Sequence, residues 1–239
     1  RRSSKYFERY VAKLADVYKD LDIQFWLTLN EPDIYPAHAY LKGEWPPEKR
    51  GIIHFYRATR NLMRAHKRAY RVLKTAMPGA QVGIAKNAVY FETPTASPWD
   101  RILCWGANKF WNFFFLDRTK TYHDFIGINY YFHNRIRGGA FNQNDNERRS
   151  DMGWELYPDG LERMLYTFWQ RYKRPLYVTE NGLADGDDSR REQFLEGHIA
   201  ALMRAKDAGV DVRGYLHWSL LDNFEWDKGF APRFGLVAI

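Results

Sequence analysis

Two glutamates, Glu31 and Glu180, each end an apolar, β-rich run of the chain. The first run finishes as Thr-Leu-Asn-Glu-Pro at residues 28–32, and the second as Val-Thr-Glu-Asn-Gly at residues 178–182. Ligands bind at the carboxyl ends of the strands in parallel α/β folds, so two such carboxylates can face one substrate. A carboxylate pair suits cleavage of a glycosidic bond, because one group protonates the leaving oxygen while the other attacks the anomeric carbon or activates water.

The remaining pattern predicts the elements that position these glutamates. Each glutamate alone would be interpreted as a solvated loop residue or a member of an ion pair, so the surrounding strands matter. Alternation of β-rich runs and helical periodicity predicts parallel strands joined by helical crossovers. The expected strands are residues 23–30, 81–89, 124–131, 175–181 and 212–221, and the expected helices are residues 4–19, 53–76, 99–119, 160–172 and 189–208. No linker-like change of composition divides the chain, so residues 1–239 are expected to form a single domain.

Composition disfavours several other classes of protein. The single cysteine, Cys104, cannot form an intrachain disulfide and fits a reducing compartment, so a cytoplasmic location is expected. No apolar run is long enough to predict a membrane span, and no signal peptide is recognised. Dehydrogenases and nucleoside triphosphatases are disfavoured, because neither glycine-rich nucleotide motif occurs.

A basic surface is expected on the helix over residues 53–76. The chain has a net charge of +7, and no acidic residue occurs between Glu48 and Glu92. Such a face can bind nucleic acid or an anionic surface, but no nucleic-acid-binding motif accompanies it. A solvated outer face is therefore favoured, and neither nucleic acid nor a membrane is expected as a partner. The basic residues at helical spacing are Arg57, Arg60, Arg64, Lys67, Arg68, Arg71 and Lys74.

The two glutamate motifs resemble the catalytic signatures of family 1 glycoside hydrolases, the retaining β-glucosidase group. Segments 127–131, 151–155 and 218–226, together with Arg-Phe-Gly at 233–235, resemble further parts of that family in the same order. The resemblance implies a (β/α)8 TIM barrel, here an incomplete one with about five parallel strands. It also implies a double-displacement mechanism that requires no metal and no organic cofactor.

The same resemblance implies roles for individual residues. Glu31 matches the acid/base and Glu180 the nucleophile, and the presence of the acid carboxylate favours O-glycosides over thioglycosides. Asn30 would bind the 2-hydroxyl, Tyr131 would donate to Glu180, and Asn129 would lie near the acid/base. The residues expected to bind substrate or support the nucleophile are Asn30, Asn129, Tyr131, Trp218, Glu225, Trp226 and Phe234.

The sugar itself is expected to be unphosphorylated. Trp218 would form the floor under the sugar ring, and Phe234 would pack near its C6 edge. Glu225 and Trp226 match positions that bind the 4- and 6-hydroxyls, and a carboxylate there would repel a 6-phosphate. The expected ligand is therefore a small β-D-glycoside or oligosaccharide, with glucosides favoured.

Part of the resembled pattern has no counterpart in these residues. The family barrel has eight strands, and the first three carry a Gln and a His-Trp pair that bind sugar hydroxyls. We therefore expect these residues to be part of a longer enzyme, or a second chain to supply the missing strands as a complementing segment. Alone, the chain is expected to be weakly active or inactive. A non-catalytic sugar-binding protein on the same scaffold is the alternative, and replacing Glu180 would leave its behaviour unchanged.

Overall fold

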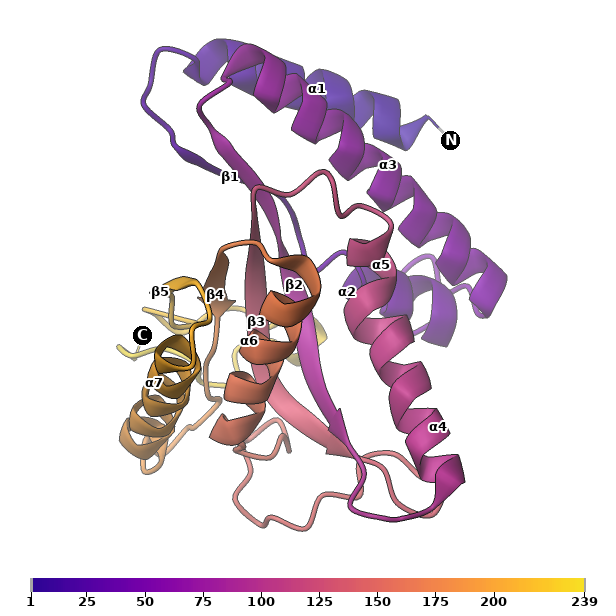
Figure 1. Cartoon of the computed structure of the whole chain (residues 1–239), viewed down its shortest axis with the longest axis vertical. Coiled ribbons are helices and arrows are strands. Elements are labelled where there is room, and N and C mark those ends of the chain that lie inside the picture. The colour runs from indigo at the N-terminus through magenta and orange to yellow at the C-terminus, as the bar shows by residue number, and fades with distance from the viewer. Residues whose placement is uncertain (1, 239) are drawn as a thin grey trace. The chain divides into compact units, whose positions relative to one another are not determined.

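The computed structural model describes residues 2–238, and its regular structure consists of five strands with helices between them (Figure 1). The strands form one sheet in the order β1-β2-β3-β4-β5, and the pairs β1–β2 and β4–β5 are parallel. The predicted parallel α/β class is confirmed. The strands are β1 (Phe25–Asn30), β2 (Gln81–Glu92), β3 (Phe125–Arg135), β4 (Leu176–Glu180) and β5 (Val212–Tyr215).

The helices follow the predicted order, with one addition after the first strand. They are α1 (Ser3–Tyr18), α2 (Ile34–Pro36), α3 (Ile52–Ala76), α4 (Pro98–Ala107), α5 (Phe114–Asp117), α6 (Pro158–Tyr172) and α7 (Arg191–Asp207). Two π-helical segments, η1 (Ala37–Lys42) and η2 (Asn108–Phe113), and a 3-10 turn, η3 (Trp226–Lys228), complete the set. The sequence did not predict α2 and η1, because a proline interrupts this short segment and no long apolar period marks it.

The helix predicted over residues 99–119 is present over residues 98–117, but its geometry changes along its length. It runs as α4, the π-helical η2 and α5 without a gap. Asn112 lies in the π-helical part, where its side-chain amide accepts from Val89 N at 3.1 Å and donates to Val89 O at 2.8 Å. Asn108 also donates from its side chain to Cys104 O at 3.0 Å. Side chains that bind backbone groups in this way compete with regular helical hydrogen bonding.

The last predicted strand, residues 212–221, is too long at its carboxyl end. β5 ends at Tyr215, and Leu216 N still donates to Val178 O at 2.8 Å. Beyond it, Ser219 N donates to Phe234 O, and Val237 N donates to Leu220 O. The backbone groups of this apolar run therefore find partners in the segment around residues 234–237 instead of continuing in the sheet.

Packing divides the chain into two compact units. The first unit comprises residues up to 87 together with 113–127, and the second comprises residues 88–112 together with those from 128 onward. The single domain over residues 1–239 stays a prediction.

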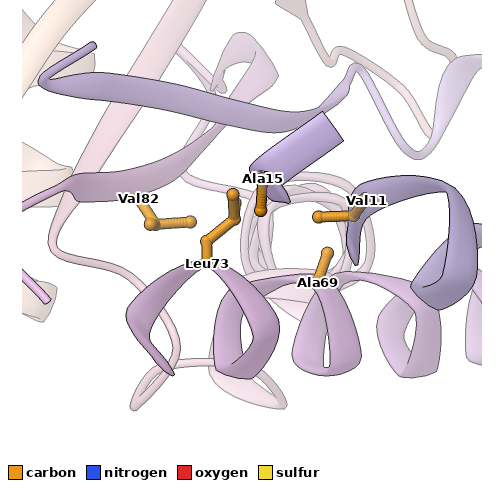
Figure 2. Close-up of a cluster of buried hydrophobic side chains, with 5 residues drawn as sticks. All are labelled: Val11, Ala15, Ala69, Leu73 and Val82. Carbon is orange, nitrogen blue, oxygen red and sulfur yellow. The ribbon is translucent and has the colours of Figure 1, made fainter. Parts of the chain in front are cut away.

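The core of the first unit lies where α1 and α3 pack side by side (Figure 1). Val11 and Ala15 of α1 meet Ala69 and Leu73 of α3, and Val82 of β2 closes the cluster (Figure 2). The two alanines are fully or almost fully buried, and their small side chains permit close approach of the helices. Each of the two amphipathic helices therefore has one apolar face, and these faces pack together and toward Val82 of β2.

The core of the second unit is built by α6, α7 and β4. Leu165 and Phe168 of α6, Phe194 and Ala201 of α7, and Val178 of β4 are all buried. Helices α6 and α7 pack against each other, β4 pairs with β5, and Val178 lies two residues before Glu180 on β4.

Part of the basic face of α3 is engaged within the first unit. Arg68 forms an ion pair with Glu8 of α1. Arg71 donates to the Tyr122 hydroxyl at 2.6 Å, and its guanidinium also lies over the Tyr122 ring. Lys74 lies 3.1 Å from Asp124. These contacts give several of the basic residues a role in holding α3 against its neighbours.

Replacement of Leu73 by alanine is expected to lower the free energy of unfolding by about 2–5 kcal/mol, because it leaves a cavity among the residues of Figure 2. Thr75→Ala on the exposed side of α3 is the control and should change stability by about 0.5 kcal/mol or less. Urea unfolding followed by circular dichroism measures both. Equal stability of the two variants would contradict the assignment of this core.

Candidate active site

Glu31 lies immediately after β1 and is fixed to β2. Its backbone N–H donates to Ala85 O at 2.8 Å, and Asn30 pairs with Ala85 in the parallel register. The backbone of Glu31 has a φ of 43°, a left-handed conformation that is uncommon for a residue with a Cβ atom. The chain therefore turns sharply here and holds Glu31 at the carboxyl end of the strand.

The side chain of Glu31 has a partner on the neighbouring strand. Asn87 of β2 donates from its side-chain amide to Glu31 Oε1 at 3.0 Å. Asn87 is buried, whereas Asn30 beside Glu31 is exposed. Sequence reasoning missed Asn87, although an asparagine within an otherwise apolar strand is the kind of signal that indicates a positioned polar group.

Glu180 is the last residue of β4 and accepts a hydrogen bond from β3. The Tyr131 hydroxyl donates to Glu180 Oε2 at 2.7 Å. A hydroxyl donor binds an ionised carboxylate more strongly than a neutral one. The predicted contact between Tyr131 and Glu180 is therefore present, and it suits a carboxylate that acts in its charged form.

Two asparagines fix the residues on either side of Glu180. Asn129 is buried and its Oδ1 accepts from the Thr179 hydroxyl at 2.6 Å. Asn181 is also buried; its side-chain amide donates to Tyr130 O at 2.6 Å and accepts from the Tyr215 hydroxyl at 2.9 Å. Burial raises the pKa of Tyr215, so this phenol stays a donor. The end of β4 is thus held from β3 and from β5.

Aromatic rings surround Tyr131. Phe234 packs edge-on against Tyr131 with ring centroids 6.2 Å apart, and Trp154 lies 5.5 Å from Tyr131 and 6.4 Å from Phe234. Phe234 is only 1% exposed. In this structure its ring supports Tyr131, a role that the sequence did not predict.

Trp218 follows β5 and is anchored to the segment after Glu180. Its backbone N–H donates to Asn181 O at 3.0 Å. Its carbonyl lies so close to Gly182 that a Cβ atom on Gly182 would be 1.8 Å from Trp218 O. The Trp218 side chain is 36% exposed, which leaves ring surface open to a ligand.

Glu225 and Trp226 lie in a loop that polar side chains hold together. Asn223 donates from its side chain to Glu225 Oε2 at 2.8 Å, while Trp226 is exposed. Asp222 is buried, accepts from Gly235 N at 2.9 Å and forms an ion pair with Arg233 at 2.7 Å. Asp222 thereby ties the loop to the segment that carries Phe234, a function that sequence reasoning missed.

A further buried polar cluster in the second unit lies on β2, β3 and the loop before α6. His133 Nδ1 is 2.8 Å from Glu155 Oε2, and Arg135 donates to Glu92 Oε1 at 2.9 Å. Burial lowers the pKa of His133 to about 4, so its ring is neutral at pH 7. The cluster binds the loop to β3.

Within residues 2–238, no three His, Cys, Asp or Glu side chains cluster closely enough to hold a metal ion. None of the helices in this part of the chain is both long enough and apolar enough to cross a bilayer. Each unit of this α/β protein thus holds one hydrogen-bonded carboxylate at the carboxyl end of a strand, the position at which parallel α/β enzymes carry catalytic residues.

Comparison with known proteins names the family. The family model described as glycosyl hydrolase family 1 matches residues 1–121 and 115–239. The chain is 33% identical to a β-galactosidase of Saccharolobus solfataricus, with 98% of the chain covering 54% of that protein. It is 30% identical to β-glucosidase A of Thermotoga maritima, with 100% of the chain covering 64% of it. The chain therefore belongs to glycosyl hydrolase family 1 and spans roughly half to two thirds of these relatives.

Solved structures agree in fold. The β-glycosidase of Pyrococcus horikoshii has a TM-score of 0.90 and 35% identity, with 99% of this chain covering 60% of that chain. The Thermotoga maritima β-glucosidase in complex with glucoimidazole has a TM-score of 0.91 and 29% identity, with coverages of 100% and 64%. The five parallel strands are thus part of a TIM barrel of this glycosidase family, as the sequence predicted.

Replacement of Gly182 by alanine is expected to destabilise the protein by more than about 3 kcal/mol, because the added Cβ would overlap the Trp218 carbonyl. Gly106→Ala in α4 is the matched control: a Cβ there meets nothing within 4 Å, so alanine should stabilise by about 0.5–1 kcal/mol. Thermal and urea unfolding measure both changes. A Gly182→Ala protein as stable as the Gly106→Ala protein would disprove the close approach.

Proposed function

We propose that the protein containing these residues is a retaining β-glycosidase that hydrolyses unphosphorylated β-D-glycosides. Glu31 is the proposed acid/base and Glu180 the proposed nucleophile. The observation that carries this proposal is the 2.7 Å hydrogen bond from Tyr131 to Glu180, which suits an ionised strand-end carboxylate. Membership of glycosyl hydrolase family 1 supports the reaction class.

In the first step, a carboxylate oxygen of Glu180 attacks the anomeric carbon while the bond from that carbon to the leaving oxygen breaks. Glu31 transfers its proton to the leaving oxygen, and the aglycone departs as an alcohol. A retaining mechanism requires the two carboxyl groups to be about 5–5.5 Å apart. The products are the free alcohol, a glycosyl ester on Glu180 and an ionised Glu31.

In the second step, Glu31 accepts a proton from water as the water oxygen attacks the anomeric carbon. The ester bond to Glu180 breaks, and Glu180 recovers its negative charge. Two inversions leave the β configuration of the sugar unchanged. Glu31 is protonated again and is ready for the next substrate.

The proposed sugar contacts come from the remaining predicted residues. Asn30 binds the 2-hydroxyl, Asn129 lies near the acid/base, and the exposed ring surface of Trp218 stacks beneath the sugar. Glu225 and Trp226 bind the 4- and 6-hydroxyls, and Phe234 packs near the C6 edge of the sugar. Relatives named β-glucosidase and β-galactosidase support a β-glycoside substrate, and aryl β-glucosides are the proposed first substrates.

Full activity is proposed to need the remaining strands of the barrel, because the chain covers 54% and 64% of two relatives. We propose that further residues of the same polypeptide, or a complementing segment, supply these strands. A cytoplasmic location is proposed from the single cysteine, Cys104.

Glu180 can be identified as the nucleophile by trapping the intermediate. A 2-deoxy-2-fluoro-β-glucoside with a dinitrophenolate leaving group should label the natural protein with one fluoroglucosyl group on the peptide containing Glu180, measured by mass spectrometry. Glu180→Gln should abolish labelling and lower kcat by more than about 10³-fold. Glu196→Gln, an exposed change on α7, is the control and should do neither. Sugar binding without labelling or hydrolysis would favour the non-catalytic alternative.

Discrimination against sugar phosphates should depend on Glu225. The wild-type protein is expected to prefer 4-nitrophenyl β-glucoside over its 6-phosphate, and Glu225→Gln should reduce that preference by about 10-fold, because a like charge several ångströms away is removed. Asp227→Asn, an exposed neighbouring carboxylate that pairs with Lys228, is the control and should leave the preference within about 2-fold. An unchanged ratio of kcat/KM in Glu225→Gln would contradict the role of this carboxylate.

A further inference from the structure

The first unit contains a fully buried ion pair beside Glu31. Lys86 of β2 and Asp33 of the loop after β1 have side chains that are 0% and 3% exposed, and Lys86 Nζ lies 2.7 Å from Asp33 Oδ2. Burial raises the pKa of Asp33, and the nearby Lys86 acts against that effect. An apolar pair of similar volume would often stabilise a fold equally well or better, so a buried pair of charges calls for a reason other than stability.

The alternation of side chains along β2 places Lys86 and Asn87 on opposite faces of the strand. Side chains alternate between the two faces of a strand, and Val82 faces the helices of the first-unit core. Lys86, four residues further on, lies on that same face, whereas Asn87 lies on the opposite face. Lys86 therefore lies on the face of β2 that packs toward the helices, while the side chain of Asn87 donates to Glu31 from the opposite face.

Three contacts join this ion pair to Glu31. Lys86 Nζ donates to Asn87 O at 2.5 Å, which fixes the backbone of the residue whose side chain donates to Glu31 Oε1. Asp33 belongs to the turn that Glu31 begins, in which Ile34 N donates to Glu31 O at 3.1 Å. The ion pair thus clamps the Glu31 turn to the end of β2 that carries Asn87.

We propose that Asp33 and Lys86 are positioning residues for Glu31: their buried ion pair holds the Glu31 turn and the Asn87 amide in the geometry that proton transfer requires. This inference rests on the proposed function for its catalytic meaning. Both side chains are buried, and the proposed role of the pair is to position Glu31 rather than to transfer a proton. Its two charges balance each other, so it restrains Glu31 without imposing a net charge beside it.

The test compares Lys86→Met, Asp33→Asn and the double variant in the natural protein. The matched control is Lys74→Met, which removes a Lys–Asp pair at the opposite end of β2, where Asp124 accepts from Val82 N. One measurement is amide hydrogen exchange at Glu31 and Ile34, and it needs no activity. The other is kcat/KM for phenyl β-glucoside, which needs an acid, and for 2,4-dinitrophenyl β-glucoside, whose leaving group does not.

Lys86→Met is expected to accelerate exchange at both amides by about 10-fold or more, since the clamp on the turn is lost. It should lower kcat/KM for the phenyl glucoside by about 30-fold or more, because general acid catalysis contributes roughly 10²–10⁴-fold. The kcat/KM for the dinitrophenyl glucoside should change by less than about 3-fold, because its leaving group needs no acid. Asp33→Asn is expected to change the amide exchange and both kcat/KM values in the same way as Lys86→Met. Lys74→Met should leave the ratio of the two substrates unchanged.

The double variant separates positioning from folding. Removing both charges is expected to restore the thermal unfolding temperature while the selective loss on the phenyl glucoside persists. Any one of three results would overturn the proposal. These are equal losses of kcat/KM on both glucosides, recovery of both the unfolding temperature and kcat/KM for the phenyl glucoside in the double variant, and unchanged amide exchange at Glu31. If the parent protein labels no Glu180 and hydrolyses neither glucoside, the proposed function fails, and exchange at Glu31 alone then decides whether the ion pair holds the turn.

Discussion

The arrangement of the second unit depends on the side-chain amide of Asn181. This one buried group donates to Tyr130 O on β3 and accepts from Tyr215 on β5, while the backbone carbonyl of Asn181 accepts from Trp218 N. It therefore sets the spacing of three chain segments around the end of β4. Glu180, Tyr131 and Trp218 are each adjacent to or hydrogen-bonded with this junction. A buried amide that satisfies donor and acceptor at once can hold such a junction without introducing charge.

Many of the elements could be predicted from sequence because their signals are local. The apolar runs that become β1, β2, β3 and β4, and the amphipathic periods of α1 and α3, are visible within a few turns of chain. The residues that stop an element were harder to predict. The helix over residues 98–117 changes from α to π geometry around Asn112, whose partner Val89 is distant in sequence, and residues 219–221 leave the sheet because they pair with residues 234–237.

The same contrast holds for the site: residues in recognisable motifs could be predicted, whereas their buried partners could not. Glu31, Glu180 and Tyr131 were identified because they stand in recognisable motifs, and the Tyr131–Glu180 contact followed from the resemblance. Asn87 and Lys86 were not identified, because nothing in a single strand sequence shows which residue a buried polar group will face. A lysine and an asparagine in succession within an apolar strand were nevertheless a detectable departure from pattern, and such departures are expected where structure serves function.

The two proposed catalytic carboxylates differ in their partners, and the difference suits their chemistry. The nucleophile must be ionised when it attacks, and Tyr131 gives Glu180 a hydroxyl donor that binds the charged form best. The acid/base must gain and lose a proton in every cycle, so a partner that strongly favours one state would hinder it. Asn87 donates to Oε1 of Glu31 from a neutral amide, which adds no net charge beside the carboxyl group. The positive charge of Lys86 is balanced by Asp33, and Lys86 also donates to the carbonyl oxygen of Asn87, the residue whose amide binds Glu31.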